Sequence, residues 1–216
     1  MTYSAERTFS FIKGVAFGLD WPNTMTALYV ARRDHKGQMR KSGEPYITHP
    51  LTVACHLLTM GIKEDAVIAA ALLHDWVEDC NGDLSTLDIS YDTRLAISLV
   101  TFDKKRYAEQ NIPKDKALAM HYDIIKRDRI ASLVKLCDRC HNVSTMAEVF
   151  TKEKIMEYIE ETETYVLPLV RSTKEQWPEH SNVLFLMKYQ ITAVLEAIKA
   201  TMPKEDNTTE KEEYHD

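Results

Sequence analysis

The sequence predicts an all-α protein, and three observations lead to this fold class. Apolar residues recur with the 3.6-residue period of a helix through most of the 216 residues, whereas runs that alternate with a period of two are scarce. Glycine (6) and proline (7) are few, so no long internal linker is expected. With 44% hydrophobic residues, the chain can bury a substantial core, and we expect a single globular unit.

The helical period marks ten segments along the chain. They are residues 5–17, 25–35, 51–60, 64–78, 84–89, 92–100, 114–126, 130–146, 152–174 and 181–200. Gly61 closes the third segment, Asn81-Gly82 interrupts the chain after the fourth, and Pro113 fits the first turn of the seventh. Pro168 falls inside the ninth segment, where the loss of a backbone donor should kink or divide the helix.

The net charge of -6 is concentrated at the C-terminus. The segment PKEDNTTEKEEYHD, residues 203–216, contains six acidic residues and two lysines, which accounts for -4 of the total. Because this tail has almost no apolar residues, we expect it to be disordered and the domain to span residues 1–202. The rest of the chain is nearly balanced and has no broad basic face. Duplex nucleic acid is therefore not an expected partner, although a local basic pocket could bind a small anion.

The four cysteines and the N-terminal sequence predict the compartment. No signal-peptide core and no apolar run of membrane-spanning length is present, so we expect a cytoplasmic protein with no membrane segment. Cys137 and Cys140 form a C-x-x-C pair, which is compatible with a redox pair or half of a zinc site. No second pair accompanies it, and two ordinary thiols in a helix are the favoured interpretation.

A cluster of ionisable side chains interrupts the apolar fourth segment. In ALLHDWVEDC, residues 71–80, His74 and Glu78 are i,i+4 neighbours if the helix is continuous, and so are Asp75 and Asp79. Burial of these groups without partners would cost roughly several kcal/mol, so something must compensate them. Exposure of a helix end to solvent is one explanation, and a functional site is the other.

Two other stretches contain possible partners for this cluster. In HKGQMRKSGEPYITHP, residues 35–50, Arg40 and Lys41 precede a glycine-containing turn. His49 and Pro50 are expected at the N-cap and N1 positions of the next helix, which would fix the position of the imidazole. A histidine that only caps the helix is the alternative interpretation.

The second stretch is LVKLCDRCHNVSTM, residues 133–146. Asp138 and Asn142 share one face of this predicted helix among apolar neighbours. An aspartate close to the core needs a cation or hydrogen-bond donors. A salt bridge to Arg139 or Lys135 is one alternative, although positions i+1 and i-3 are not both well placed for it.

Imidazole nitrogens and carboxylates together favour a divalent ion such as Mn²⁺, Fe²⁺, Zn²⁺ or Mg²⁺. Four protein ligands would leave positions open on a six-coordinate ion, where a water can be activated. Glu78 and Asp79 would lie just outside the ligands, one to orient or deprotonate the water and the other to assist the leaving group. The predicted ligands are His49, His74, Asp75 and Asp138.

Three stretches in this order, HKGQMRKSGEPYITHPLTVA, AALLHDWVED and LVKLCDRCHN, resemble the HD-domain hydrolases of the RelA/SpoT group, especially the small alarmone hydrolases of the Mesh1 type. The resemblance runs from about Thr24 to Met146. It implies an all-α HD fold, a manganese ion, and removal of the 3′-pyrophosphate from (p)ppGpp to give GDP or GTP and pyrophosphate. It also implies that the four predicted ligands bind the metal and that the acidic pair is catalytic.

The resemblance further implies positions for a nucleotide. Arg40 and Lys41 occupy the positions that flank the base, and Asn142 and Thr145 match residues that line its ribose and phosphate side. Ser144 stands where an arginine is frequent in the family, which bears on substrate preference. The chain has no room for the synthetase domain of the long RelA/SpoT enzymes, so the resemblance implies a hydrolase only.

Two other functions are compatible with these motifs, and the oligomeric state is left open. An HD phosphohydrolase could act on a different nucleotide, for example at the 2′-phosphate of NADPH. A non-catalytic nucleotide-binding or antitoxin-like protein could keep the fold, although it would not need a set of residues that activates water. Lys135 and Arg139 are further candidates to bind an anionic substrate, with a solvated helix face as the alternative.

Overall fold

The computed structural model describes residues 4–202 and confirms the all-α fold class. Within that range no strand is present, and an isolated bridge pairs Met39 with Pro45. The elements are α1 (Ala5–Gly18), α2 (Pro22–Asp34), α3 (Thr48–Thr59), α4 (Asp65–Leu73), α5 (Trp76–Cys80), η1 (Leu84–Thr86), α6 (Tyr91–Val100), α7 (Lys104–Glu109), α8 (Lys114–Ile125), α9 (Arg129–Met146), α10 (Lys152–Glu161), η2 (Thr162–Val166), α11 (Leu167–Gln176), η3 (Pro178–His180) and α12 (Ser181–Thr201).

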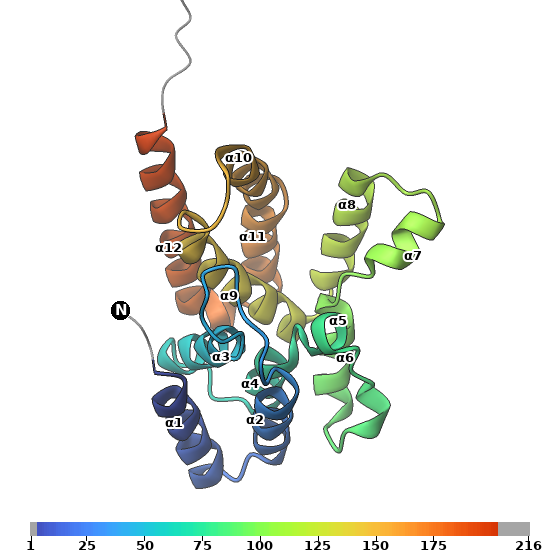
Figure 1. Cartoon of the computed structure of the whole chain (residues 1–216), viewed down its shortest axis with the longest axis vertical. Coiled ribbons are helices and arrows are strands. Elements are labelled where there is room, and N and C mark those ends of the chain that lie inside the picture. The colour runs from blue at the N-terminus through green and yellow to red at the C-terminus, as the bar shows by residue number, and fades with distance from the viewer. Residues whose placement is uncertain (1–3, 203–216) are drawn as a thin grey trace, which may run out of the picture.

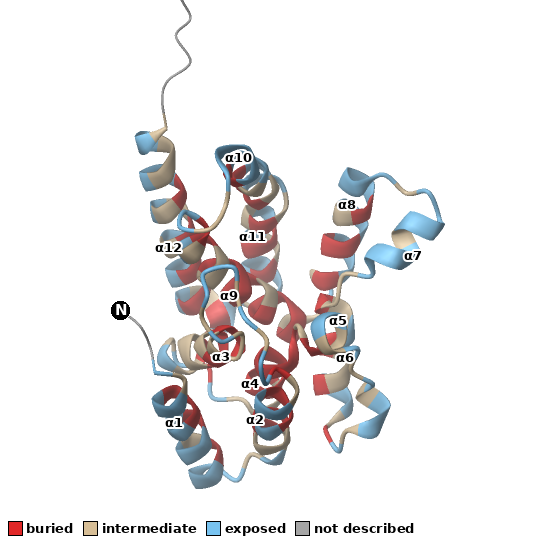
Figure 2. Cartoon of the chain, in the orientation of Figure 1, coloured by how far each residue is buried: buried red, intermediate tan, exposed pale blue. Residues whose placement is uncertain are grey.

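Helices α4 and α9 form the centre of the molecule. The sequence of α4, DAVIAAALL, is apolar on every side after its first residue, and α4 packs against α2, α3, α6 and α9. Helix α9 also contacts α11 and α12, so it joins the N-terminal helices to the C-terminal ones. Figure 2 shows both helices largely buried, whereas α7 lies exposed at the tip of an arm that it forms with α8 (Figure 1).

The predicted continuous helix over residues 64–78 is wrong, because the chain divides there into α4 and α5. The His74 ring is the visible cause. Its Nδ1 lies 2.8 Å from the carbonyl oxygen of Ala71, the atom that the Asp75 amide would bond in an uninterrupted helix. The predicted i,i+4 relation holds for Asp75 and Asp79, since the Asp79 amide donates to the Asp75 carbonyl oxygen at 2.8 Å, whereas the chain division separates His74 from Glu78.

Other helix boundaries also differ from the prediction. The segment 84–89 is reduced to the short turn η1, where the Asp83 side chain accepts from the Ser85 amide. Helix α7 was not predicted, because none of its residues is buried and it has no apolar period to detect. His49 is not at an N-cap, since α3 begins one residue earlier, at Thr48.

The ninth predicted segment is divided, as Pro168 indicated. Helix α10 runs into the π-helical turn η2, and α11 then begins at Leu167, so that the proline lies in its first turn. The predicted acidic tail lies outside the described residues. Within residues 4–202, no helix combines the length and apolarity that crossing a membrane would require.

Candidate metal centre and active-site cleft

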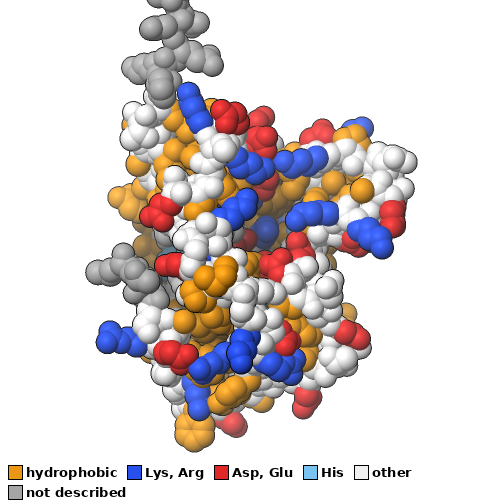
Figure 3. Space-filling view, viewed as in Figure 1, with side chains coloured by type: hydrophobic (Ala, Val, Ile, Leu, Met, Phe, Trp, Pro, Cys, Tyr) orange, Lys and Arg blue, Asp and Glu red, His pale blue; other side chains and the backbone are white. Residues whose placement is uncertain are grey.

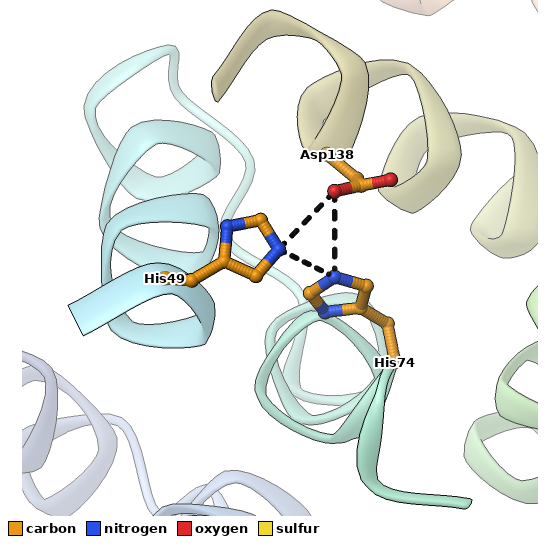
Figure 4. A group of neighbouring side chains, drawn as sticks. All are labelled: His49, His74 and Asp138. Carbon is orange, nitrogen blue, oxygen red and sulfur yellow. Dashed lines mark hydrogen bonds and ion pairs between the residues drawn. The ribbon is translucent and has the colours of Figure 1, made fainter. Parts of the chain in front are cut away.

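The predicted ligands, which come from three distant segments of the chain, lie together. His49 projects from α3, His74 from the end of α4 and Asp138 from the middle of α9, and all three are buried (Figure 4). The Nε2 atoms of the two histidines are 3.0 Å apart. Asp138 Oδ1 lies 3.2 Å from His49 Nε2 and 3.5 Å from His74 Nε2.

Asp75 supplies a fourth donor to the same cluster. Its Oδ2 lies 3.3 Å from His49 Nε2 and 3.2 Å from His74 Nε2. The hydroxyl of Tyr46 donates to the same oxygen at 2.6 Å and holds the carboxylate in place. Each carboxylate therefore lies close to both imidazoles. Asp75 comes from the α4–α5 junction and Asp138 from α9.

The spacing and chemistry of these four residues fit a divalent cation. In an octahedral site with bonds of about 2.1 Å, neighbouring donor atoms are roughly 3.0 Å apart, close to the separations in this cluster. The donors are two nitrogens and two carboxylate oxygens, a mixture that suits borderline or hard divalent ions. His49, His74, Asp75 and Asp138 are thus the residues that would hold such an ion.

Contacts at the Nδ1 atoms of His49 and His74 leave the Nε2 atoms of both rings available as ligands. The Nδ1 of His74 donates to the Ala71 carbonyl oxygen, so its Nε2 carries the lone pair. The Nδ1 of His49 lies 2.7 Å from Nδ1 of His141. Burial, His49 and Arg40 lower the pKa of His141 to about 3, so this ring is neutral and can accept the proton of His49.

The electrostatics of the cluster without a cation depend on proton sharing. Burial opposes a charge on His74, but the Asp75 and Asp138 carboxylates outweigh it and raise the pKa of this imidazole above its ordinary value. Burial likewise opposes ionisation of Asp138, yet Lys135, His49 and His74 hold the pKa of its carboxyl well below the usual range. A proton on His74 therefore compensates the carboxylates when no metal does so.

The predicted alternative of a salt bridge to Asp138 is present in part. The Lys135 ammonium lies 3.5 Å from Asp138 Oδ2, while the Asn142 amide donates to Oδ1 at 2.6 Å. Arg139 points elsewhere. Its guanidinium donates to Glu161 and to the hydroxyl of Tyr122, the latter at 3.1 Å.

The acidic pair lies on α5, one turn beyond the predicted ligands. Glu78 Oε1 accepts a hydrogen bond from the Phe102 amide at 2.6 Å, and Lys104 Nζ lies 3.7 Å from Oε2. Asp79 lines the same cleft as Glu78 and three of the predicted metal ligands, His49, Asp75 and Asp138. The structure therefore brings the pair beside the cluster, although on a separate helix.

The chain reverses sharply after the acidic pair, and the reversal fixes α5. Asn81 adopts a left-handed conformation, with φ of 53°, and ends the helix. Gly82 then passes over the ring of Trp76, where a Cβ would lie 2.3 Å from the indole. The same indole donates to Asp34 at 2.8 Å, which ties α5 to α2.

The predicted substrate-binding residues line a common wall. The Arg40 guanidinium donates to Asn142 Oδ1 at 3.3 Å and to Thr145 Oγ1 at 3.5 Å. Lys41 lies over the ring of Phe150, with its Nζ 5.1 Å from the centroid. Gly43, with φ of 83°, closes the tight turn that presents Arg40 and Lys41.

All of the predicted metal, catalytic and substrate-binding residues except His74 border a cleft of about 530 Å³ between the α7–α8 arm and α10. Figure 3 shows a hollow there with basic side chains around it. The cleft has the size and polarity of a ligand site, and its positive rim suits an anionic molecule. Seven cationic residues line it, namely Arg40, Lys41, Lys104, Lys114, Lys135, Arg139 and Lys154.

Two residues of this site had no predicted role. Tyr46 orients Asp75, and His141 accepts from His49. His141 lies three positions after Asp138 on α9, so helical spacing could have indicated it, whereas Tyr46 lies before α3 and has no such signal. Cys137 and Cys140 are buried free thiols with pKa values raised chiefly by burial, which agrees with the favoured interpretation of the C-x-x-C pair.

Known proteins have sequences similar to this region. A family model described as HD domain matches residues 27–169. The GTP pyrophosphokinase of Streptomyces coelicolor is 37% identical over 146 residues, which are 66% of this chain and 17% of that protein. The bifunctional (p)ppGpp synthase/hydrolase SpoT of Escherichia coli is 36% identical over 131 residues, which are 57% of this chain and 18% of that protein. The chain thus spans less than a fifth of the length of these relatives.

The fold is similar to that of a solved structure described as a metazoan ortholog of SpoT that hydrolyzes ppGpp and plays a role in starvation responses. The TM-score is 0.63, and the two sequences are 21% identical. The likeness covers 82% of this chain and 96% of the other. It supports the arrangement of helices described above.

Proposed function

The chain belongs to the HD-domain family, and from this premise we propose that it is a metal-dependent hydrolase that removes the 3′-pyrophosphate of (p)ppGpp, with GDP or GTP and pyrophosphate as products. The observation that carries the proposal is the convergence of two imidazoles and two carboxylates beside an acidic pair, in a cleft with a basic lining. The names of the relatives, which include (p)ppGpp hydrolases, support this choice of substrate.

The proposed metal is Mn²⁺, held by His49, His74, Asp75 and Asp138. Support comes from the mixed nitrogen and oxygen donors and from the Nδ1 contacts of both histidines, which leave their Nε2 atoms to face the two carboxylates. The ion would supply a Lewis acid that makes water a nucleophile near neutral pH.

Glu78 and Asp79 are the proposed acid–base pair. One carboxylate accepts a proton from the water that attacks the phosphorus next to the 3′-oxygen. The other donates a proton to the 3′-oxygen as its bond to phosphorus breaks. The bond from the Phe102 amide to Glu78 supports this role, because it holds the carboxylate in the cleft wall next to the ligands.

The nucleoside is proposed to bind on the wall formed by the 36–47 loop and the end of α9. Arg40 and Lys41 would flank the base, with Asn142 and Thr145 on the ribose and phosphate side. The hydrogen bonds from Arg40 to Asn142 and Thr145 support the assignment, because they join the two predicted pairs of residues in one surface.

The decisive experiment supplies the manganese-loaded protein with ppGpp, pppGpp, pppApp and NADPH in parallel and measures release of pyrophosphate and phosphate. Release of pyrophosphate from the guanosine compounds is expected, and it should disappear in Glu78→Gln with metal content unchanged. If NADPH is the only compound that releases product, and that product is phosphate, NADPH replaces (p)ppGpp as the proposed substrate. Binding without any product would instead indicate a non-catalytic nucleotide-binding protein.

Three further proposals complete the assignment. Residues 1–202 would form one HD hydrolase domain. A small nucleotide rather than duplex nucleic acid would be the partner, which the gathering of seven lysines and arginines around one cleft supports. A cytoplasmic location is proposed because all four cysteines are free thiols, as is usual in a reducing compartment.

A further inference from the structure

Gln38 lies in the 36–47 loop and has no part in the steps above, yet its side chain joins two helices to this loop. The amide nitrogen donates to the main-chain carbonyl oxygen of Asp79 at 3.2 Å and contacts the Cys80 thiol at 3.5 Å. The amide oxygen lies 2.8 Å from Nδ1 of His35, which caps α2. Because the Asp79 carbonyl can only accept, the amide nitrogen must face it, and the amide oxygen is left to accept from His35.

The contact satisfies an open end of α5. Asp79 is the last residue but one of this five-residue helix, and the last carbonyl groups of a helix have no intrahelical partner. The Gln38 amide supplies a partner for one of them. Other contacts hold the start of the helix, through the Trp76 indole, and Glu78, through the Phe102 amide. Gln38 therefore adds the contact that holds the backbone of Asp79 itself.

The two ends of the 36–47 loop lie side by side. The amide of Tyr46 donates to the main-chain carbonyl oxygen of Gln38 at 2.9 Å. The hydroxyl of Tyr46 holds the Asp75 carboxylate, and its ring stacks on that of His35 with centroids 4.9 Å apart. The base of one loop thus contacts a predicted metal ligand and the helix of the acidic pair, while the turn between its ends presents the proposed nucleoside-binding residues.

We propose that Gln38 is a positioning residue for the acidic pair, an inference that rests on the proposed function. Through the main chain of Asp79, it sets where the carboxylates of α5 lie relative to the metal ligand that Tyr46 holds. Gln38 is not among the described residues that line the cleft, so it acts through Asp79 and not on the substrate. The same loop thereby relates the place of the nucleoside to that of the acid–base groups.

Two substitutions test the amide. Gln38→Met keeps the length of the side chain and removes both bonds, whereas Gln38→Glu keeps an oxygen for His35 and removes the donor to Asp79. In both variants kcat for ppGpp should fall about ten- to hundredfold, because a displaced acid–base group slows the chemical step, while KM changes less than about twofold. Manganese content and melting temperature should stay close to wild type. If Gln38→Met does not fold, Gln38→Glu decides by the same criteria.

Gln176→Met is the matched control. The amide of Gln176 also donates to a main-chain carbonyl oxygen, that of Lys126 at 3.0 Å, and Gln176 lies outside the cleft lining. This variant should keep the kcat and KM of the wild type. A wild-type kcat in the Gln38 variants would overturn the proposal. So would parallel losses of kcat, manganese content and melting temperature, which a purely structural contact would produce.

Amide hydrogen exchange separates this inference from the proposed function, because it requires no turnover. The amides of Asp79 and Gly82 bond main-chain carbonyl oxygens at the start of α5, so their exchange reports on the helix end. In Gln38→Met both should exchange about three- to tenfold faster than in the wild type, and in Gln176→Met at the wild-type rate. Faster exchange in a protein that turns over no alarmone would keep the contact and remove the proposed function. Unchanged exchange in Gln38→Met would overturn the positioning role even in an active enzyme.

Discussion

Asp138 and Arg139 are neighbours on α9, and both are almost fully buried, yet their surroundings are opposite. The Arg139 guanidinium meets the Glu161 carboxylate and the Tyr122 hydroxyl, and it packs on the ring of Tyr158 at 4.0 Å. Its charge is therefore answered by a carboxylate and an aromatic face.

Asp138 is surrounded by groups that answer its charge only in part. The Lys135 ammonium is at the 3.5 Å limit of a hydrogen bond, and the other carboxylate oxygen faces His49 and His74. The nearby Asp75 adds a second negative charge to the same imidazoles. The comparison indicates that Arg139, with matched partners, serves the fold, whereas Asp138, which shares its partners with a second carboxylate, belongs to a candidate cation site.

The largest expected effect comes from Asp138→Asn. Loss of one ligand charge should remove the metal and reduce turnover about a thousandfold or more, because the amide is a weaker ligand. The melting temperature of the metal-free protein should stay within a few degrees of wild type. Metal analysis, pyrophosphate release and thermal unfolding measure the three quantities. A variant that keeps its metal and its turnover would remove Asp138 from the site.

Glu78→Gln should separate the chemical step from metal binding at the site that contains Asp138. Loss of an acid–base group is expected to lower kcat about 10²- to 10⁴-fold, while the metal content stays at the wild-type level. Steady-state kinetics with parallel metal analysis provides the measurement. If kcat is unchanged, Glu78 has no role in the reaction.

Arg139→Met should lower stability, because Arg139 is the residue of the two that serves the fold. Removal of one partner leaves the Glu161 carboxylate without its cation, so the free energy of unfolding should fall by about 3–5 kcal/mol. Urea denaturation measures the change, and Arg171→Met, a solvent-exposed arginine of α11, is the control. Nearly wild-type stability together with lost turnover would mean that Arg139 serves the substrate instead.

His141→Phe should produce a smaller loss, confined to metal affinity. The phenyl ring keeps much of the volume but cannot accept the proton of His49, so the affinity for Mn²⁺ should drop about 10- to 100-fold. His56→Phe, at a half-buried histidine of α3, is the matched control. Titration of both variants with Mn²⁺ makes the comparison, and equal affinities would deny His141 its orienting role.

The smallest expected effect is a pH dependence of metal binding. Because Asp75 and Asp138 raise the pKa of His74, the metal-free protein holds a proton there at pH values below that raised pKa. The ion must displace this proton, so affinity should fall about tenfold per pH unit below the raised pKa and level off above it. Competition with a metal indicator across this range tests the slope. An affinity independent of pH would show that no proton is displaced.

Local sequence patterns predicted most of the fold. Apolar periodicity located the helices that bury a stripe, and Pro168 indicated the division between α10 and α11. The break at His74 was not predictable in this way, because its cause is a contact of that ring with the Ala71 carbonyl oxygen, which no apolar period indicates. Helix α7 was missed for a different reason, since a helix without a buried residue has no apolar stripe to detect.

The site was predicted to a similar extent. The motif residues were named in advance, and the structure brings His49, His74, Asp75 and Asp138 together, while their roles stay predictions. The role of Tyr46 was not predicted. This residue precedes α3, where no period of the sequence places its side chain, and its contact with Asp75 arises only in the folded chain.

The shortness of α5 has a further consequence. This helix has five residues, and its length fixes the direction in which Glu78 and Asp79 point relative to the predicted ligands at its start. Deletion of a single residue before Glu78 would turn both carboxylates by about 100° around the helix axis. An insertion after Gly82 would only lengthen the connection to η1. A change of length is therefore expected to be tolerated after Gly82 but not between Asp75 and Glu78.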